Sequence, residues 1–290
     1  MKILMPLVVF AICLGACGDP PVDEAASGQG RAHMLDCPHY DGLDTVAALA
    51  ESHVLIFGEA IHGTNESPEA LSAMACGLLA QGEPVRVGLE ATYTQTAALN
   101  AFLENPENLE ALRLGASDMW STHDGRSSVA ILSLLKTLAG WRKGGADISV
   151  FAFDANVGEW VASANQSVAR DAAMARHVNE ALNGFDGAVL LLTGGFHARK
   201  EPFSLNDHHF VPMATGITSR PVLSLEMRHA GGSGWMIGEV DGEPFKGAIV
   251  LNNLLPEGSP VRAFRLESPS AAYDGIYFTG PITASPPAFP

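Results

Sequence analysis

Five short segments of the chain are almost wholly apolar, and each has the length of a β-strand. None of them alternates between apolar and polar positions, as a strand with one solvent-exposed face would. Each is therefore typical of a strand that is buried on both faces, in a sheet covered by helices. The segments are residues 53–57, 85–89, 148–153, 188–193 and 221–225, with a sixth candidate at 275–279.

Helical patterns lie between these strands. Ser67 and Pro68 are typical of a helix start, as N-cap and first helical residue, and an apolar stripe follows them. Two further amphipathic stretches cover residues 127–141 and 166–182. The alternation predicts an α/β fold: a single domain over residues 32–290, with a central, mostly parallel or mixed sheet and helices on both faces.

The N-terminal residues are typical of a secretory signal. Lys2 precedes an apolar run over residues 3–14, which is too short to span a bilayer. The sequence LGAC that ends at Cys17 resembles a bacterial lipobox, so we expect removal of residues 1–16 and lipidation of Cys17. Residues 17–31 then form a flexible tether on an envelope protein, lipid-anchored in the periplasm and sorted to the outer membrane. The alternative is a plain secretory signal with an incidental cysteine.

The charge balance narrows the class of partner. The 290 residues carry 32 acidic and 17 basic side chains, a formal charge of −15. Binding to duplex nucleic acid needs clusters of Lys and Arg that this chain lacks. We therefore expect a small-molecule substrate or ligand, no nucleic acid, and membrane contact through the lipid anchor only.

Two cysteines are left once the signal is removed and Cys17 is lipidated. These are Cys37 and Cys76. In an oxidising periplasm an isolated pair is more often a disulfide than a catalytic or metal site. We predict a Cys37–Cys76 bond, with a reactive thiol as the alternative.

Polar groups follow the apolar strands at corresponding positions. In an α/β sheet, ligands bind outside the carboxyl ends of the strands, so groups that end parallel strands collect on one edge. We predict a shared site there, against the alternative of solvated strand ends. The groups are Glu59, Glu90, Asp154 and Glu226, and His197 after the fourth strand.

The densest chemistry lies in the loop at residues 58–66 (GEAIHGTNE). Its Glu59 and His62 are three residues apart, directly before a helix. Such a pair can share a water, with the imidazole as base and the carboxylate orienting it, or can ligate a divalent metal. The alternative is a loop that only caps the next helix, which would explain Glu66 well but Glu59 and His62 poorly.

Three further residues are weaker candidates for substrate binding. Asp171 interrupts an apolar helical face, and either it or Arg170 could point at the shared site. The alternative for Asp171 is a simple favourable charge near the helix N-terminus. His123 lies in a loop before a helix and could cap it. The sequence has no G-x-S-x-G, Walker A, G-x-G-x-x-G or H-E-x-x-H motif, which disfavours the usual serine hydrolases and nucleotide enzymes.

Several of these motifs, in this order, resemble the erythromycin esterase family and its superfamily, which also holds the ChaN haem-binding lipoproteins and the TraB/Tiki proteins. The resemblance covers nearly the whole chain after the tether. The motifs are GEAIHGTNE at 58–66, LEA at 89–91, Trp120 with the following helix and FAFD at 151–154, RDAAM at 170–174, TGGFH at 193–197 and YDGIYFTGPITAS at 273–285.

The resemblance implies a set of active-site groups and three possible activities. Glu59, His62, Glu90 and His197 match the superfamily's active-site positions. In the esterases the first histidine activates water for attack on a lactone, without a covalent intermediate. Tiki relatives are metal-dependent peptidases, for which Glu59, His62 and His197 would be the ligands, and ChaN binds haem.

The chain departs from the esterases in two respects. They carry His-Asn-x-His at the late motif, where this chain has Gly194 in the first of those positions. Its Gly-Gly-Phe-His is nearer to the ChaN and Tiki form. The chain is also shorter than the macrolide esterases. Both departures weaken the case for a macrolide substrate.

We therefore expect a hydrolase that acts on an ester or related acyl bond. His62 would be the base, with Glu59 and Glu90 orienting it and the water, and His197 would contact the oxyanion or a metal. Substrate-binding candidates are Glu66, Asp154, Arg170, Asp171 and His123. The alternatives are a haem- or ligand-binding lipoprotein and a metal-dependent peptidase. Because haem capture usually calls for an exposed axial Tyr or His beside an apolar patch and only 4 Tyr are present, a divalent metal is the first cofactor candidate and haem the second.

Overall fold

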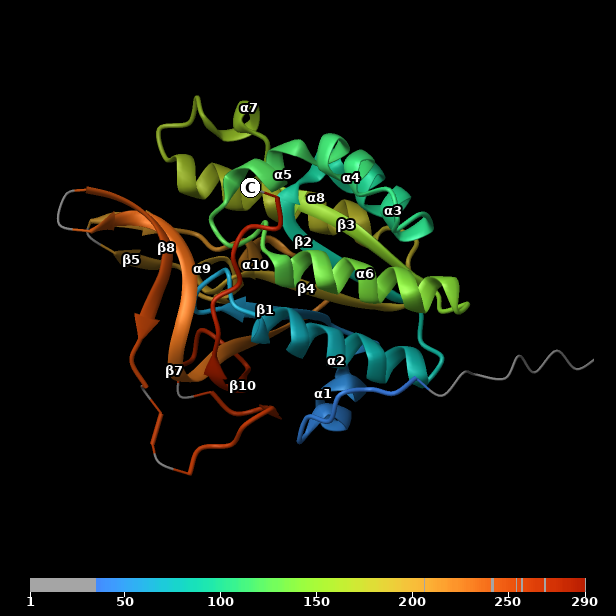
Figure 1. Ribbon diagram of the computed structural model, residues 1–290. Coiled ribbons are helices and arrows are strands. Elements are labelled where there is room, and N and C mark those ends of the chain that lie inside the picture. Colours follow the sequence, from blue (N-terminus) through green and yellow to red (C-terminus); the bar gives the residue numbers. More distant parts are fainter. Residues whose placement is uncertain are drawn as a thin grey trace, which may run out of the picture. The chain divides into compact units, whose positions relative to one another are not determined.

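The computed structural model describes residues 35–205, 207–240, 243–253, 255–256, 258–268 and 270–289. The expected signal sequence, Cys17 and the tether lie outside the described residues. Within them, the centre of the protein is an eight-stranded sheet with helices on both faces (Figure 1). The α/β fold predicted from the sequence is confirmed.

All five apolar segments form neighbouring strands of this sheet. The strand order is β3-β2-β4-β1-β7-β10-β9, and the pairs from β3 to β10 are parallel. The sixth candidate is also a strand, and it lies next to β7. The strands are β1 (Val54–Glu59), β2 (Val85–Thr92), β3 (Ile148–Asp154), β4 (Ala188–Gly194), β7 (Val222–Val240), β9 (Ala263–Arg265) and β10 (Gly275–Ile282).

The strands lack a polar alternation because each faces two apolar cores. In β1, Leu55 and Phe57 belong to one core, whereas Val54 and Ile56 belong to the other. All four side chains are fully buried. Successive side chains of a strand point to opposite faces, so a strand between two helical layers needs apolar residues at every position.

The two cores are closed by different helices. The first face is covered by α1 (Leu43–Ala50), α2 (Glu66–Ala80), α3 (Thr96–Glu104), α4 (Leu109–Gly115), α5 (Ser117–Thr122) and α6 (Val129–Lys143), and the short η1 (Tyr93–Gln95) joins β2 to α3. The second face is covered by α8 (Gln166–Leu182), α9 (Gly195–Ala198) and α10 (Met213–Gly216), with the short α7 (Val157–Trp160) preceding α8. In Figure 1, α2 and α6 lie across the front of the sheet and α8 behind it.

The start of α2 differs from the sequence prediction. The helix begins at Glu66 with Asn65 as the N-cap residue, two positions before the expected cap at Ser67. Ser67 is fully buried instead, and its hydroxyl lies 3.2 Å from both Met227 Sδ and Tyr277 Oη. The prediction of the cap was wrong because the polar side chain turns inward, where it finds partners from β7 and β10.

Two hairpins were not predicted. β7 continues far beyond residue 225 and pairs with the antiparallel β8 (Glu243–Leu251). A smaller two-stranded sheet joins β5 (Phe203–Leu205) to β6 (His208–Phe210). β8 alternates between exposed and half-buried residues, so its apolar end, Ala248–Leu251, is not a strand buried on both faces.

The predicted disulfide is present. Cys37 and Cys76 are joined, with their Cα atoms 5.5 Å apart. The bond ties the segment before α1 to the middle of α2. No helix in the described part of the chain is both long enough and apolar enough to cross a membrane.

Candidate functional site

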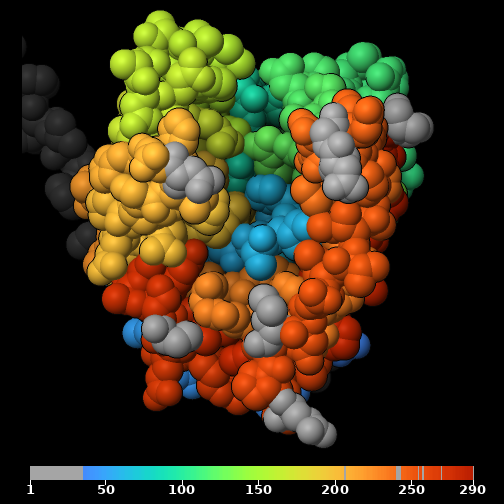
Figure 2. Space-filling view, turned by 90° about the vertical axis from the view of Figure 1, so that its left-hand side faces the viewer, coloured from blue at the N-terminus to red at the C-terminus, as the bar shows by residue number. Residues whose placement is uncertain are grey.

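The carboxyl ends of four parallel strands meet at one edge of the sheet. β1 brings Glu59, β2 brings Glu90, β3 brings Asp154, and His197 follows β4 on α9. Figure 2 looks onto this edge: the loop after β1 (blue) forms the floor of a hollow between the β5–β6 hairpin (amber) and the β7–β8 hairpin (orange). Glu226 does not end a strand, because β7 continues past it, and its carboxylate binds Arg228.

Glu59 and His62 form a hydrogen-bonded pair. Nδ1 of His62 lies 2.8 Å from Oε2 of Glu59, whose side chain is 7% exposed. This contact holds the Nδ1 proton, so in the neutral ring the lone pair is on Nε2. That atom is 3.9 Å from Glu90 Oε2, too far for a hydrogen bond. Nε2 is therefore left open toward the centre of the site.

The same pair sets the charge of His62. Burial alone would lower the pKa of the imidazole, but the carboxylates of Glu59 and Glu90 outweigh it, and the net shift of the pKa is upward. Burial also raises the pKa of Glu59, against the opposing effect of His62. His62 consequently takes up a proton more readily than a free imidazole does.

A second histidine is oriented in the same way. Nδ1 of His197 lies 2.8 Å from Oδ1 of Asp171, which also accepts a hydrogen bond of 2.7 Å from the backbone N–H of Met213. Asp171 thus points at the site, as one of the two sequence interpretations held. Nε2 of His197 is 3.1 Å from Arg170 Nη1 and 3.7 Å from Glu90 Oε1.

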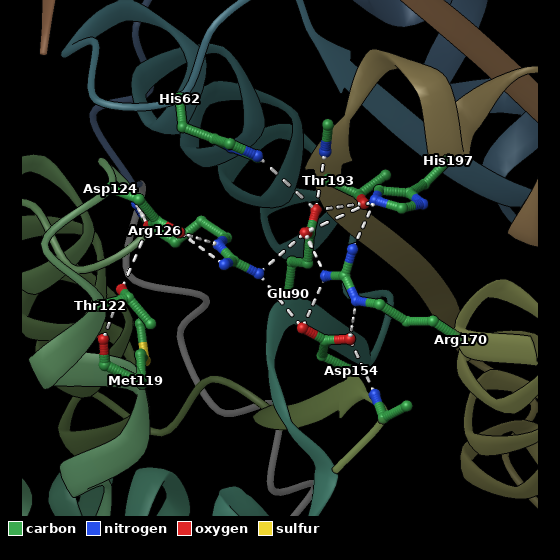
Figure 3. A network of polar contacts seen from close by, with 12 residues as sticks. His62, Glu90, Met119, Thr122, Asp124, Arg126, Asp154, Arg170, Thr193 and His197 are labelled. Carbon is green, nitrogen blue, oxygen red and sulfur yellow. Dashed lines mark hydrogen bonds and ion pairs between the residues drawn. The ribbon is translucent and has the colours of Figure 1, made fainter. Parts of the chain in front are cut away.

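Glu90 lies at the centre of the contacts (Figure 3). Its Oε2 accepts from Thr193 Oγ1 at 2.6 Å and from the N–H of Gly194 at 2.8 Å. Its Oε1 accepts from Arg126 Nη1 at 3.0 Å and Arg170 Nη2 at 2.9 Å. Burial raises the pKa of this carboxyl, but His197, Arg126, His62 and Arg170 outweigh burial and hold the pKa well below its usual range. Glu90 is an ionised acceptor whose lone pairs are all occupied.

Asp154 completes the arginine cluster. It binds Arg170 through two parallel contacts, Nε to Oδ1 at 2.8 Å and Nη2 to Oδ2 at 2.7 Å. Its Oδ2 also accepts from Arg126 Nη1 at 3.1 Å. Such paired contacts fix the plane of the guanidinium as well as its position. Asp154 and Arg170, two of the predicted substrate-binding residues, therefore lie in the site.

Arg126 is the functional residue that sequence reasoning missed. The signal in the sequence is an Asp-Gly-Arg loop shortly before α6, next to the predicted candidate His123. Gly125 explains how the loop comes so close, because it has φ 104° and a Cβ there would lie 2.4 Å from the backbone nitrogen of Gly63. Only glycine allows this approach, and it brings Arg126 beside the His62 loop.

Two predicted substrate-binding residues have other contacts. The ring of His123 lies 2.6 Å from Lys246 Nζ, and the backbone carbonyl of His123 accepts a hydrogen bond from Trp235 Nε1. His123 therefore joins the loop before α6 to the β7–β8 hairpin. Glu66 accepts from the backbone N–H and the hydroxyl of Thr283, at 3.0 and 2.7 Å. None of the polar contacts found among the described residues joins Glu66 to the cluster around Glu90.

Gly194 lies between the two histidines. A Cβ at this position would be 3.2 Å from His62 Nε2 and 3.6 Å from His197 Cδ2. The backbone itself is ordinary, with φ −57° and ψ 144°. The glycine is thus required for space rather than for backbone conformation. It is the position at which the esterases carry a histidine, and here it leaves room next to Nε2 of His62.

The surroundings of His197 do not suit a metal cation. In the described residues, no three His, Cys, Asp or Glu side chains are grouped to hold a metal. A guanidinium nitrogen of Arg170 contacts Nε2 of His197 at 3.1 Å. A cation at His197 would have to displace that positively charged group.

Comparison with known proteins supports the fold. The sequence matches no family model and no curated relative. Erythromycin esterase EreC, as a histidine-to-asparagine variant in its open conformation, is similar in structure, with a TM-score of 0.58 and 12% identity over 84% of this chain and 97% of that chain. A succinoglycan biosynthesis protein gives a TM-score of 0.62 and 10% identity, over 86% of this chain and 93% of that one. ChaN of Campylobacter jejuni, with cofacially bound haem, gives 0.44 and 12%, over 72% and 90%. The resemblance to the erythromycin esterases seen in the motifs is confirmed at the level of a shared fold.

Proposed function

We propose that the protein is a hydrolase that activates water with the Glu59–His62 pair and cleaves an ester or related acyl bond. The observation that carries the proposal is the state of His62. Its Nδ1 is held by a buried carboxylate, and its Nε2 is open toward a site that contains two guanidinium groups. A base oriented by a carboxylate next to preorganised positive charge is the arrangement that water-activated acyl cleavage requires.

The proposed reaction is a direct displacement by water. Nε2 of His62 takes a proton as the water oxygen bonds to the carbonyl carbon, and Glu59 stabilises the imidazolium that forms. The electron pair of the carbonyl moves to its oxygen, which the positively charged guanidinium groups of Arg126 and Arg170 stabilise, and His197 holds Arg170 in place by accepting from it. When the tetrahedral intermediate collapses, the bond to the alcohol oxygen breaks and His62 returns its proton to the leaving alcohol. The products are an acid and an alcohol, and the ring is neutral again.

Glu90 and Asp154 act on this reaction through other groups. Both bind Arg126 and Arg170, so they fix the guanidinium groups in place before substrate arrives. Because this network is largely buried, its dipoles need not reorganise during the reaction. Neither carboxylate is assigned as the base, because their oxygens are already occupied by donors.

The test is an ester hydrolysis assay combined with analysis of bound metal and haem. Protein purified without chelator is assayed before and after dialysis against EDTA. We expect hydrolysis that is unchanged by EDTA. If EDTA removes a stoichiometric metal together with the activity, and adding the metal back restores the activity, a metal-dependent peptidase or esterase is favoured instead. Bound haem without any ester turnover would replace the hydrolase with a ligand-binding protein.

We also propose that the chain is a lipoprotein of the cell envelope, lipidated at Cys17. The disulfide between Cys37 and Cys76 supports an oxidising compartment. Growth of a bacterial host with a radioactive fatty acid should label the protein, and cell fractionation should recover it with the membranes. Cys17→Ala should abolish both, and label that persists in this variant would contradict the proposal.

A further inference from the structure

A cavity opens beside the proposed reaction centre, with a volume of about 360 Å³. We call it the aromatic pocket. Its walls come from α7, α8, α9 and the β5–β6 hairpin. Its lining includes Arg170, Asp171, Phe196, His197, Phe203 and Phe210.

One wall of the pocket is a group of three phenylalanine rings. Phe203 and Phe210 are stacked, with centroids 4.9 Å apart and planes at 11°. Phe196 packs on them at 5.2 Å from Phe203, yet its side chain remains 55% exposed. Arg199 holds Phe203 from another side, with its guanidinium carbon 4.7 Å from the ring. A cluster of partly exposed rings at the mouth of a cavity marks a place where an apolar ligand gains by binding.

The inner end of the pocket is the reaction centre itself. Arg170, Asp171 and His197 line the pocket and also belong to the network around Glu90. In Figure 2 the amber β5–β6 hairpin borders the hollow whose floor is the loop after β1. A ligand with an apolar group between the phenylalanines therefore presents its polar end to Arg170 and His197.

We propose that the aromatic pocket receives an apolar group of the ester substrate, while the carbonyl lies between His62 and His197. This inference rests on the proposed function and names its substrate class. A cavity of about 150 Å³ holds one benzene, so a volume of 360 Å³ suits roughly two fused rings or an alkyl chain of about eight carbons. The preferred substrates are esters of that size.

The kinetic test uses two series of esters. In one series the alcohol is methanol and the acyl chain grows from acetyl to decanoyl. In the other the acyl group is acetyl and the alcohol grows from methanol to decanol. We expect kcat/KM to rise about fourfold per methylene in one series, up to about eight carbons, and then to level off. The series that rises identifies whether the acyl or the alcohol group occupies the pocket, and a flat response in both would overturn the proposal.

Variants of the pocket give the matched control. Phe203→Ala and Phe196→Ala should flatten the rising series, with a loss of about tenfold for the octyl ester and little loss for the shortest one. Because Phe196 is partly exposed, its removal leaves the core intact. Leu205→Ala is the control: it removes an exposed apolar side chain from the same hairpin but does not line the pocket. An equal loss in the Leu205 variant would mean that only the hairpin's folding matters, which contradicts the proposal.

Binding of 2-naphthol separates the pocket from the catalytic proposal. Titration calorimetry should show one molecule bound per chain with a negative heat-capacity change, weaker binding in Phe203→Ala and unchanged binding in Leu205→Ala. This result would support the pocket even if no ester is hydrolysed, in which case the proposed function alone fails. Absence of binding to the unaltered protein would overturn the pocket, whatever the protein hydrolyses.

Discussion

Nε2 of His62 is open, and a buried carboxylate holds its Nδ1. The protonation state of this one residue therefore determines whether the proposed reaction can proceed. Because its pKa is raised above the ordinary 6.5, His62 stays protonated to a higher pH than a free imidazole does. Only the neutral ring can accept a proton from water. We therefore predict that kcat/KM increases with pH along a limb whose midpoint lies above 6.5.

Glu59→Gln tests the cause of that limb. The amide keeps the shape of the side chain but removes the charge that raises the pKa of His62, so burial should then lower it. The midpoint should move to lower pH and kcat should fall by roughly 10- to 100-fold, as the imidazolium loses its support. pH-rate profiles of the original protein and of Glu59→Gln measure both the midpoint and kcat. An unchanged midpoint would show that Glu59 does not set the charge of His62.

Glu90 governs stability as well as the site. Glu90→Gln leaves Arg126 and Arg170 short of a buried counter-charge, which should cost about 3 kcal/mol of the free energy of unfolding at pH 7. The folded-state pKa of Glu90 is depressed below 4.5, so its contribution is fully present above pH 4.5 and is lost as the pH falls through the folded value.

Urea denaturation at pH 7 and at pH 3.5 measures this effect. The difference between the original protein and Glu90→Gln should shrink at the lower pH. The control is Glu110→Gln, which breaks an exposed pair with Arg113 and should change stability little at either pH. A difference for Glu90 that stays constant with pH would contradict the assigned charge.

Gly194→Ala tests the space between the histidines. The backbone accepts alanine, but the added methyl would lie 3.2 Å from His62 Nε2. We predict a fall in kcat of about tenfold, with a change in stability below about 1 kcal/mol, because only the imidazole has to move. Kinetics and thermal melting of the same sample check both. A large loss of stability with unchanged activity per folded molecule would show that the glycine serves the fold instead.

At the scale of elements, the apolar segments predicted the strands well because burial on both faces leaves a clear signal. The hairpins were not predicted, since β8 is half exposed and β5 and β6 have three residues each. The missed β5–β6 hairpin matters for the site. Phe203 and Phe210, which line the aromatic pocket, belong to the small hairpin, and nothing in the linear sequence shows that they face His197.

The disulfide is the element-scale feature that gives a stability prediction. It closes a loop with a sequence separation of 39 residues, for which the chain-entropy estimate is about 4 kcal/mol. Reduction should therefore lower Tm, and Cys37→Ser should melt at the lower temperature with or without reductant. Differential scanning calorimetry measures this. Equal melting of the original protein in both conditions would mean that the bond contributes nothing.

At the scale of the whole molecule, parallel strands turn distant residues into neighbours. Glu59, Glu90 and Asp154 could be predicted to meet because each lies at or near the carboxyl end of a strand of one sheet. Arg126 could not, because it lies on a loop whose position depends on the contact between Gly63 and Gly125. Strand ends are set by local pattern, whereas loop positions depend on packing that the sequence does not display.

The fold does not choose among the activities of its neighbours, so the choice depends on the site. Nδ1 of each histidine is paired with a carboxylate, and a guanidinium group of Arg170 contacts Nε2 of His197, which favours a base at His62 and an oxyanion site over a metal cation at His197. The central claim is therefore that His62 removes a proton from water.

The most direct measurement is the hydrolysis of octanoyl and acetyl esters by His62→Ala, in EDTA, beside the original protein and the control His39→Ala, whose side chain is 88% exposed. All three should have the same circular dichroism spectrum and nearly the same Tm. We predict that kcat falls by about 10²- to 10⁴-fold in His62→Ala and is unchanged in His39→Ala. Hydrolysis by His62→Ala at the original rate would contradict the account.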